Sequence, residues 1–411
     1  MGRRGLESRF RDASGEGHPL ARPLRILVVG AGVGGISVAR GLLRDGHDVT
    51  VFERRPDARA GGGAVTIWSN GATVLEQLGV DMDGAGQRLS SVRVVTSTGR
   101  PLVTLDLTAM VDRLGAPIRM VPRRVVLERL LDGFASDRIR FNARVVNVVS
   151  ADDGVRVEFE DGSTAEGDLL IGADGLHSKV RDIVGARDAK PTGWCSWQGL
   201  ATLPSVPDKR VALLVIGERG NLGLWPAGGS EVQWWFDLPW SNRFVRPERP
   251  VDVIREHFAG WCDAVDGLLA TLTDEDLADS PYPHFRHPIP PPGRGPLTLL
   301  GDAAHTMPPT LAQGTNQALL DTMVLCKALS DYQRGDLPKV LRWYEKTRRR
   351  SVAAVSRVTS LQVSHGEAVL MPAAVIPDRY MTWALTTFLS SVSHRRISAE
   401  VSRDLATATS L

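Results

Sequence analysis

The chain has 411 residues, a formal net charge of +2, 23% charged residues and 43% hydrophobic residues. This balance is ordinary for a folded protein of two or three lobes, and it argues against a nucleic-acid-binding protein or one with a highly charged partner. Three cysteines, Cys195, Cys262 and Cys326, are far apart and form no CxxC pair. We therefore expect a reducing, cytoplasmic compartment and no metal site.

Two segments resemble targeting signals only superficially. Residues 1–22 are rich in Arg and Gly and contain no apolar stretch, so we expect a disordered leader or an upstream start codon, and not a secretory signal. The fairly apolar run 368–392 is interrupted by Pro372, Pro377 and the charged pair Asp378-Arg379. It is too broken for a membrane span and predicts a helix packed on the protein body, so no membrane partner is expected.

The first organised unit is a strand at 24–30, a turn, a helix at 36–43 and a second strand at 48–53. The turn reads Gly-Ala-Gly-Val-Gly-Gly from residue 30 to residue 35, which is a GxGxxG pattern. This βαβ order predicts an α/β fold with a Rossmann-like domain that binds an ADP-containing dinucleotide. The pattern does not separate FAD from NAD.

The residues of this unit have separate expected roles. Gly30 permits the tight turn, Gly32 lets a pyrophosphate approach the backbone, and Gly35 lets the helix pack closely. The N-terminus of the helix faces the pyrophosphate. Glu53 ends the second strand, where its carboxylate can accept hydrogen bonds from ribose hydroxyls.

A second strand-loop-helix unit lies near residue 300. An apolar strand at 297–300 stops at Gly301-Asp302, a loop containing Pro308-Pro309 and Gln313-Gly314 follows, and 318–329 reads as a helix. A carboxylate at a strand end can bind sugar-like hydroxyls, and a loop that opens a helix offers N–H groups to an anionic atom.

The string Gly301-Asp302-Ala303-Ala304-His305, with Pro309, Gly314, Asn316 and Asp321 at these spacings, resembles the second FAD motif of the class A, single-component flavoprotein monooxygenases. Para-hydroxybenzoate hydroxylase and the tetracycline-inactivating monooxygenases belong to that family. The resemblance implies that Asp302 holds the ribityl chain, that Pro309 lies near the isoalloxazine, and that the loop amides face the flavin N1/O2 edge. Ala312 departs from the family, which usually has glycine there, so an extra methyl restricts φ in this loop.

Two further elements match the family in order and separation. Asp174, Gly175, Ser178 and Arg181 resemble its Asp-Gly motif, which the family uses for FAD and pyridine-nucleotide contact. Arg124, at Arg-x-x-Leu spacing, resembles the arginine that reaches FAD, and Arg123 is the competing choice. The resemblance covers residues from about 24 to 330. The predicted cofactor residues are Gly30, Gly32, Gly34, Gly35, Glu53, Arg54, Arg124, Asp174, Gly301, Asp302, Pro309, Gly314, Thr315 and Asn316.

The middle of the chain predicts the substrate side. Seven of the ten tryptophans fall between Trp194 and Trp261, in stretches that read as antiparallel strands. Gln198 stands where many relatives carry Arg, which disfavours a carboxylated substrate. The candidate substrate residues are Trp68, Gln198, Trp225 and Trp234. The alternative is that the tryptophans simply fill a small core.

These patterns predict a discontinuous FAD-binding domain, a substrate-binding domain with a mixed, largely antiparallel sheet, and C-terminal helices. The expected boundaries are 23–75 with 119–190 and 281–330 for FAD, 76–118 with 191–280 for substrate, and 331–411 for the helices.

The resemblance implies an NAD(P)H- and O2-dependent monooxygenase that holds FAD non-covalently. It would hydroxylate or epoxidise an aromatic or polyketide-like small molecule through a C4a-hydroperoxyflavin. No acid or base residue is expected to be catalytic, because the cofactor performs the chemistry. NADPH or NADH would dock transiently, and the chain would be a monomer or weak dimer. Two alternatives remain: a flavin-dependent halogenase, although its Trp-x-Trp-x-Ile-Pro signature is absent, and a non-redox or cyclase-type FAD-binding protein.

Overall fold

The computed structural model describes most of the chain outside its two ends. The described residues are 23–58, 62–151, 154–203, 208–218, 220–288, 292–330, 336–370 and 374–393, with the side chains of 151 and 362–370 left out. The predicted leader, residues 1–22, lies outside them.

Sheet A is a five-stranded sheet in the order β18-β12-β1-β2-β8, and every recorded pairing in it is parallel. Its central strands are almost continuously buried, as expected for a parallel sheet covered on both faces. The strands are β1 (Arg25–Val29), β2 (Asp48–Phe52), β8 (Ile139–Arg140), β12 (Leu169–Gly172) and β18 (Leu297–Leu299).

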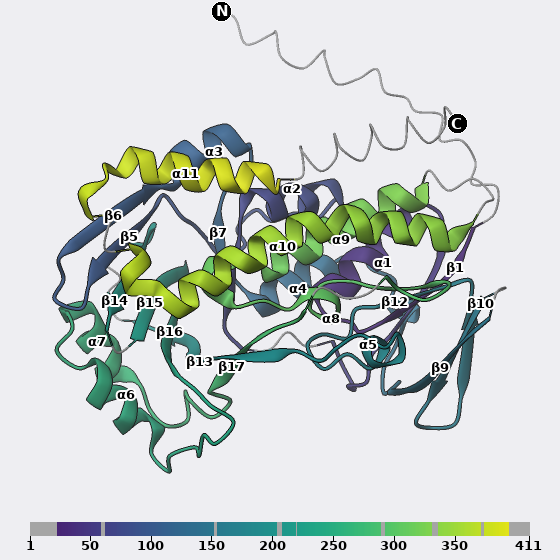
Figure 1. Ribbon diagram of the computed structural model, residues 1–411, viewed down its shortest axis with the longest axis horizontal. Helices are drawn as coiled ribbons and strands as arrows, with labels where there is room; N and C mark the ends of the chain where they lie inside the picture. The colour runs from purple at the N-terminus through teal and green to yellow at the C-terminus, as the bar shows by residue number, and fades with distance from the viewer. Residues whose placement is uncertain are drawn as a thin grey trace, which may run out of the picture.

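Helices cover one face of sheet A and a small antiparallel sheet covers the other (Figure 1). The helical layer consists of α1 (Val33–Arg44), α2 (Ser69–Gln77), α4 (Arg123–Leu131) and α9 (Gly314–Ser330). The opposite layer consists of β9 (Val145–Ala151), β10 (Gly154–Phe159), β11 (Thr164–Gly167) and the short helix α5 (Lys179–Ile183). This layered arrangement confirms the predicted α/β fold with a βαβ unit at its start.

Sheet C has seven strands in the order β17-β13-β16-β15-β14-β5-β6, antiparallel except where β14 runs parallel to β5. The predicted mixed sheet is therefore confirmed. Its strands are β5 (Ser91–Thr96), β6 (Pro101–Asp106), β13 (Lys190–Thr202), β14 (Val211–Gly217), β15 (Gly220–Gly228), β16 (Glu231–Pro239) and β17 (Tyr282–Arg286).

Side chains alternate across sheet C and pack into two different cores. One face, with Trp197, Trp234 and Phe236, packs against α6 (Pro250–Phe258) and α7 (Asp263–Thr271). The other face turns toward the rest of the molecule. There, Trp225 shares a core with Trp68, and α3 (Leu107–Leu114) and α11 (Asp378–Ser391) contribute to it.

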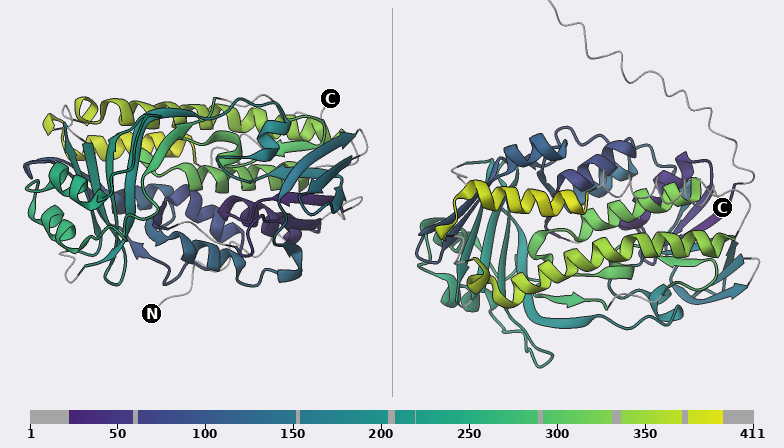
Figure 2. Two further views of the ribbon diagram at one scale, coloured as in Figure 1. Left: turned by 90° about the horizontal axis from the view of Figure 1, so that it is seen from below. Right: turned by 45° about the horizontal axis from the view of Figure 1, so that its top comes forward.

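Two elements join the lobes. Sheet B, in the order β3-β7-β4, lies between them and consists of β3 (Ala64–Ile67), β4 (Gln87–Arg88) and β7 (Arg119–Pro122). The 34-residue helix α10 (Leu337–Leu370) runs along the molecule, contacting α9 near one end and β13 and β14 near the other (Figure 2). The remaining short elements are α8 (Asp302–His305), η1 (Ser136–Arg138) and η2 (Pro309–Leu311).

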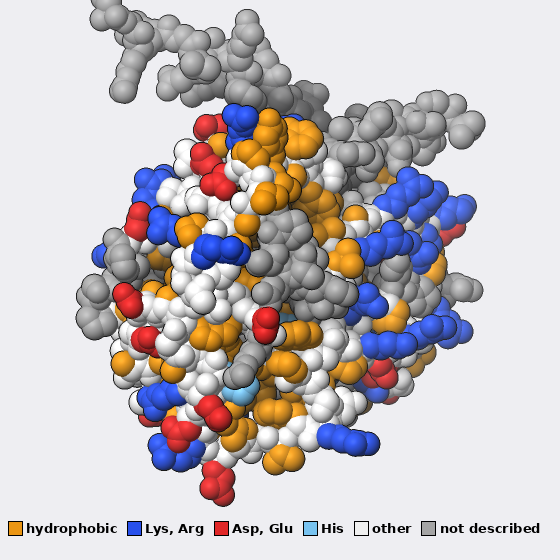
Figure 3. Space-filling view, turned by 60° about the vertical axis from the view of Figure 1, so that its left-hand side comes forward, with side chains coloured by type: hydrophobic (Ala, Val, Ile, Leu, Met, Phe, Trp, Pro, Cys, Tyr) orange, Lys and Arg blue, Asp and Glu red, His pale blue; other side chains and the backbone are white. Residues whose placement is uncertain are grey.

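The predicted domain boundaries remain a prediction, with one difference in strand pairing. Residues 281–330 were assigned to the cofactor domain, yet β17 pairs with β13 in sheet C. No helix among the described residues is long and apolar enough to cross a membrane. The face that carries the sheet C end shows a strip of hydrophobic side chains between charged ones (Figure 3).

Candidate cofactor and substrate site

The glycine turn after β1 is shaped by close backbone packing. Gly30 has φ +106°, and a Cβ there would lie 2.4 Å from the carbonyl oxygen of Ala173. A Cβ on Gly35 would lie 1.8 Å from the carbonyl oxygen of Gly30. Gly32 differs from both, because a Cβ there would meet nothing within 4 Å. Open space therefore lies in front of Gly32, at the N-terminus of α1, where a pyrophosphate is expected to approach.

Gly34 packs within the protein. A Cβ on Gly34 would lie 2.8 Å from Cδ2 of Leu300, the residue before Gly301. Gly34 as a cofactor residue stays a prediction, and the structure adds that its lack of a side chain lets α1 lie against Leu300. Sequence spacing could not reveal this contact, because the two segments are far apart in the chain.

Glu53 is held by the backbone of the glycine turn. Its Oε2 accepts a hydrogen bond of 2.9 Å from the backbone N–H of Ala31, and its Oε1 accepts one of 2.9 Å from the backbone N–H of Arg55. Each carboxylate oxygen keeps a further lone pair for a ligand hydroxyl. Arg54 beside it is exposed.

The Gly-Asp loop and the start of α9 lie beside each other. Gly301 adopts φ 60°, and the exposed Asp302 is the first residue of α8. A methyl group on Gly314 would lie 3.8 Å from Oδ1 of Asp302. Because α9 begins at Gly314, the N–H groups of Gly314, Thr315 and Asn316 have no acceptor within the helix. An anionic edge and the ribityl hydroxyls of FAD fit this combination of N–H donors and a carboxylate.

The two candidate arginines of α4 point to different places. Arg124 is exposed, and its Nη2 lies 3.6 Å from Glu231 in an ion pair at the surface. Arg123 is turned inward: its Nε is buried without a hydrogen-bond partner, and its charge interacts with Asp302 and Tyr282. Burial lowers the pKa of Arg123, and those two acidic groups oppose that effect. The structure therefore favours Arg123, the competing choice, over the predicted Arg124.

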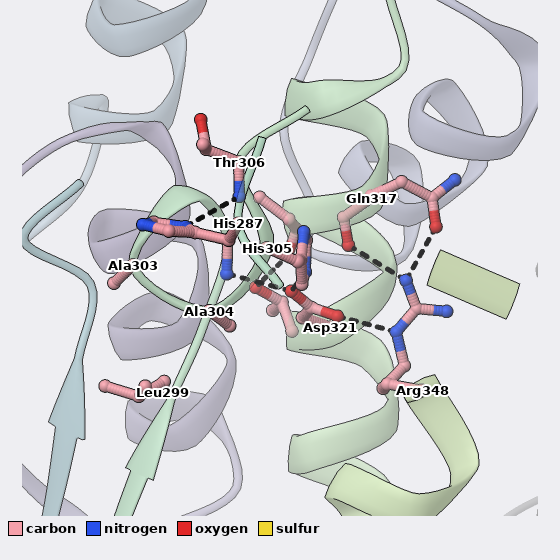
Figure 4. A network of polar contacts seen from close by, with 12 residues as sticks. His287, Leu299, Ala303, Ala304, His305, Thr306, Gln317, Asp321 and Arg348 are labelled. Carbon is pink, nitrogen blue, oxygen red and sulfur yellow. Dashed lines mark hydrogen bonds and ion pairs between the residues drawn. The ribbon is translucent and has the colours of Figure 1, made fainter. Parts of the chain in front are cut away.

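Asp321 is the centre of a buried polar network beneath the Gly-Asp loop (Figure 4). Its Oδ2 accepts hydrogen bonds from the N–H of Gly301 at 2.9 Å and pairs with Nε2 of His305 at 2.6 Å. Its Oδ1 accepts a hydrogen bond of 2.6 Å from Nε of Arg348 in α10. Burial raises the pKa of Asp321, but the charges of His305 and Arg348 and their hydrogen bonds outweigh it and bring the pKa to about 2.

Asn316 and Ala312 shape the loop that leads into α9. The side chain of Asn316 accepts from the N–H of Trp68 and donates to the carbonyl oxygens of Thr66 and Ala312, at 2.8–2.9 Å. These bonds use both amide hydrogens, so the donor that Asn316 keeps for a cofactor is its backbone N–H. Ala312 adopts φ 48°, the left-handed region that glycine prefers, so the loop keeps this backbone conformation despite the methyl group.

The Asp-Gly motif makes hydrogen bonds within its own segment and to the Gly-Asp loop. Both oxygens of Asp174 accept bonds from its own segment, namely Ser178 Oγ, Lys179 N and Val180 N. Arg181, 2% exposed, donates to the carbonyl oxygens of Ala303 and Ala304 at 3.0 and 2.9 Å. In this structure Asp174 orders the start of α5, and Arg181 fixes the carbonyls of α8. Pro309 is exposed at the edge of the same site.

The candidate substrate residues fall on two faces of sheet C. Gln198 and Trp235 are cross-strand partners on the inward face, and the rings of Trp225 and Trp235 are 5.8 Å apart. Trp68 lies in the same core as Trp225. Trp234 is fully buried on the opposite face, against Phe236 at 5.7 Å. The placement of Trp234 therefore disfavours it as a pocket residue. Strand alternation required one of the pair to face inward, and the sequence did not show which.

Comparison with known proteins identifies the family. The FAD binding domain family FAD_binding_3 matches residues 24–359, and the chain belongs to it. The chain is 32% identical over 335 residues to an FAD-dependent urate hydroxylase of Klebsiella pneumoniae, covering 79% of this chain and 86% of the relative. It is 33% identical over 380 residues to a chloroplastic zeaxanthin epoxidase of Prunus armeniaca, covering 85% of this chain and 57% of that relative.

Solved structures agree with this assignment. HpxO of Klebsiella pneumoniae in complex with FAD and uric acid superposes with a TM-score of 0.80, 26% identity and coverage of 90% of this chain and 97% of HpxO. The tetracycline destructase Tet(55) shares the fold with a TM-score of 0.69 at 20% identity. The class is therefore the class A FAD-dependent monooxygenases. The predicted family, enzyme class and FAD cofactor are confirmed.

Proposed function

We propose that this chain uses NAD(P)H and O2 to hydroxylate, or epoxidise, a small aromatic or heterocyclic molecule between the Gly-Asp loop and the inward face of sheet C. FAD supplies the oxygen activation when it is bound. The observation that carries the proposal is the convergence of three features on one space: Asp302, the N-terminus of α9, and the inward-turned Arg123. These groups can hold and orient the flavin.

The inward face of sheet C supplies the substrate side of this proposal. The ring of Trp235 covers Gly223 so closely that a Cβ there would lie 2.1 Å from it, and Trp225 flanks it. Two indole rings give a rigid apolar wall for a planar substrate and keep water out. Gln198, opposite Trp235, offers an amide and no charge. We therefore propose an uncharged or weakly acidic ring system without a carboxylate as the substrate class.

The direct test is NADH and NADPH oxidation over a panel of purines, phenols and hydroxypyridines, with products identified by mass spectrometry under 18O2. Uric acid belongs in the panel because one relative is named for it. We expect one 18O atom in the product, and no product without O2. If FAD binds but NAD(P)H never reduces it, the chain is a non-redox FAD-binding protein.

The proposed pocket face has a matched test in Trp235→Ala and Trp234→Ala. Removing Trp235 should raise KM and divert NAD(P)H oxidation to hydrogen peroxide, because water enters the pocket. Removing Trp234 should mainly lower the melting temperature, since it leaves a cavity in the core. Peroxide released per NAD(P)H oxidised separates the two, and the reverse pattern would place the pocket on the other face.

A further inference from the structure

Ser196, Asp237 and His284 form a buried polar cluster that spans the three neighbouring strands β13, β16 and β17. Oγ of Ser196 hydrogen-bonds to Oδ1 of Asp237 and lies 2.6 Å from Nε2 of His284. The residues are 3%, 9% and 4% exposed. His284 keeps one ring nitrogen, Nδ1, that is buried without a partner. This order, carboxylate–hydroxyl–imidazole, differs from a hydrolytic triad because the serine stands in the middle.

The cluster lies on the inward face of sheet C. Ser196 and Asp237 are cross-strand partners two residues from Gln198 and Trp235, and the Trp235 side chain also hydrogen-bonds to Asp237. On the same side of β17, Tyr282 interacts with Arg123, while Arg286 donates to Ser360 of α10. His284 lies between these two residues in the strand. Strand alternation therefore places the His284 side chain on the same side of β17 as Tyr282 and Arg286.

Within the described part of the chain, no cation pairs with Asp237 to fix its charge. Among the described residues no Lys or Arg pairs with it, and the titratable groups recorded beside it are His284, 3.8 Å away, and Cys195 of β13. Burial raises the pKa of Asp237 to about 7 against the hydrogen bonds of Ser196 and Trp235. Burial lowers the pKa of His284 to about 4. At neutral pH the imidazole is therefore uncharged, and the carboxyl can gain or lose a proton.

Hydrogen-bond accounting gives the cluster two complementary states. With Asp237 ionised, Ser196 donates to it, Nε2–H of His284 donates to Ser196, and Nδ1 is a bare acceptor. With Asp237 protonated, it donates to Ser196, Ser196 donates to Nε2, and Nδ1 carries the hydrogen. One proton accepted at Nδ1 therefore becomes one proton stored on Asp237, with every bond in the chain reversed.

We propose that Ser196, Asp237 and His284 form a proton relay, in which Nδ1 of His284 accepts a proton from a weakly acidic hydroxyl or ring N–H of the bound molecule and Asp237 stores it. The step balances: the O–H or N–H of the bound molecule loses one proton, and the Asp237 carboxylate gains one through His284 and Ser196. Deprotonation makes such a ring more electron-rich and thus more reactive toward an electrophilic oxygen. The relay deepens the proposed function and rests on it.

The first measurement needs neither cofactor turnover nor substrate. Infrared difference spectra of the purified holoenzyme between acidic and alkaline pH should include the signal of a carboxylic acid that titrates near neutrality. The signal should disappear in Asp237→Asn and remain in Asp279→Asn, an exposed acid near the same strand. In Ser196→Ala the titration should move to higher pH, because one bond that lowers the pKa is gone. A neutral-pH signal of unchanged size in Asp237→Asn would overturn the relay, whatever the enzyme's reaction is.

The second measurement uses a substrate from the panel described above. In wild type, kcat should fall as the pH drops below about 7, because protonated Asp237 cannot accept another proton. Asp237→Asn and His284→Phe should lower kcat at least tenfold with little change in KM, and the acidic limb should vanish. FAD reduction by NAD(P)H should stay within twofold. Identical pH profiles in wild type and Asp237→Asn would remove the cluster from catalysis even if the carboxyl titrates.

Discussion

Among the described residues, Asp321 and Asp237 are buried carboxylates beside histidines, and they differ in whether a guanidinium pairs with them. Asp321, under the Gly-Asp loop, meets His305, the N–H of Gly301 and the guanidinium of Arg348. Asp237, in sheet C, meets Ser196, Trp235 and the uncharged His284, and no Lys or Arg of the described residues pairs with it. The pKa of the first is about 2 and that of the second about 7. A buried acid with a guanidinium is a fixed charge that organises structure, whereas one without it can exchange protons.

The largest effect should come from removing the cation. Arg348→Met removes the guanidinium from the buried Asp321 and leaves it only His305 and the N–H of Gly301. Breaking a buried ion pair typically costs about 3–5 kcal/mol, and the pKa of Asp321 should rise toward that of Asp237. We expect a lower urea midpoint and faster loss of FAD. Arg350→Met, an exposed neighbour in α10, is the control and should stay near wild type. A similar midpoint for both variants would mean that Arg348 does not fix the charge of Asp321.

The pH dependence of stability should have opposite signs at the two carboxylates. The lowered pKa of Asp321 contributes roughly 2 kcal/mol that is present above about pH 4 and is lost as the pH falls toward about 2. The raised pKa of Asp237 gives a penalty that is absent at about pH 4 and grows until about pH 7. In Asp321→Asn, the unfolding free energy should no longer fall as the pH drops from about 4 to about 2. In Asp237→Asn, it should no longer fall as the pH rises from about 4 to about 7. Parallel curves for all three proteins would contradict the contrast.

Arg123 is the converse case, a buried cation whose Nε lacks a partner. If it meets an anionic or carbonyl group of FAD, Arg123→Met should weaken FAD binding about tenfold or more, since a hydrogen bond to a charged group is worth about 1.5–3 kcal/mol. Arg124→Met removes only a surface ion pair, and its FAD dissociation constant should stay within about twofold. Flavin fluorescence titration of the apoproteins measures both. If Arg124→Met weakened FAD binding more than Arg123→Met does, Arg124 would be the arginine that reaches FAD, as the sequence predicted.

The smallest effect concerns the loop above the Asp321 network. Ala312→Gly removes the strain of a left-handed backbone conformation, which costs an alanine about 1–2 kcal/mol. Glycine also raises the conformational entropy of the unfolded chain, which destabilises the folded state by about 0.4–1 kcal/mol. The net result should lie between no change and a gain of about 1.6 kcal/mol, seen as a small rise in melting temperature. Ala303→Gly, within the short helix α8, should lower it, and a fall in both variants would show that Ala312 is unstrained.

The sequence predicted what depends on local geometry and missed what depends on partners across the chain. The roles of Gly30 and Gly35 follow from one turn, and the structure shows the tight backbone contacts that require them. Arg123 and Arg124 are adjacent at the start of a helix, so only the surrounding fold decides which one turns inward. Likewise, alternation placed Trp234 and Trp235 on opposite faces without saying which face was which.

The sequence could not predict the proton relay either, because its residues meet only through strand pairing across the chain. Ser196 and Asp237 meet only through the register of β13 with β16, and His284 joins them only because β17 pairs with β13. Strand register between segments 41 and 88 residues apart is not written in any local pattern. No catalytic acid or base was expected, and the chain nevertheless buries a titratable pair beside the proposed pocket.

Asn316 has a consequence for how the protein is made. Its amide joins backbone groups of Thr66 and Trp68 across 250 and 248 residues of sequence. Contacts this distant form only after the intervening chain exists, so they close late in folding. During synthesis the glycine turn emerges early. The loop before α9 cannot form its hydrogen bonds to β3 until Asn316 has left the ribosome. A nascent chain truncated before that point should therefore be unable to retain FAD, and cofactor capture should follow, and not guide, the assembly of the two lobes.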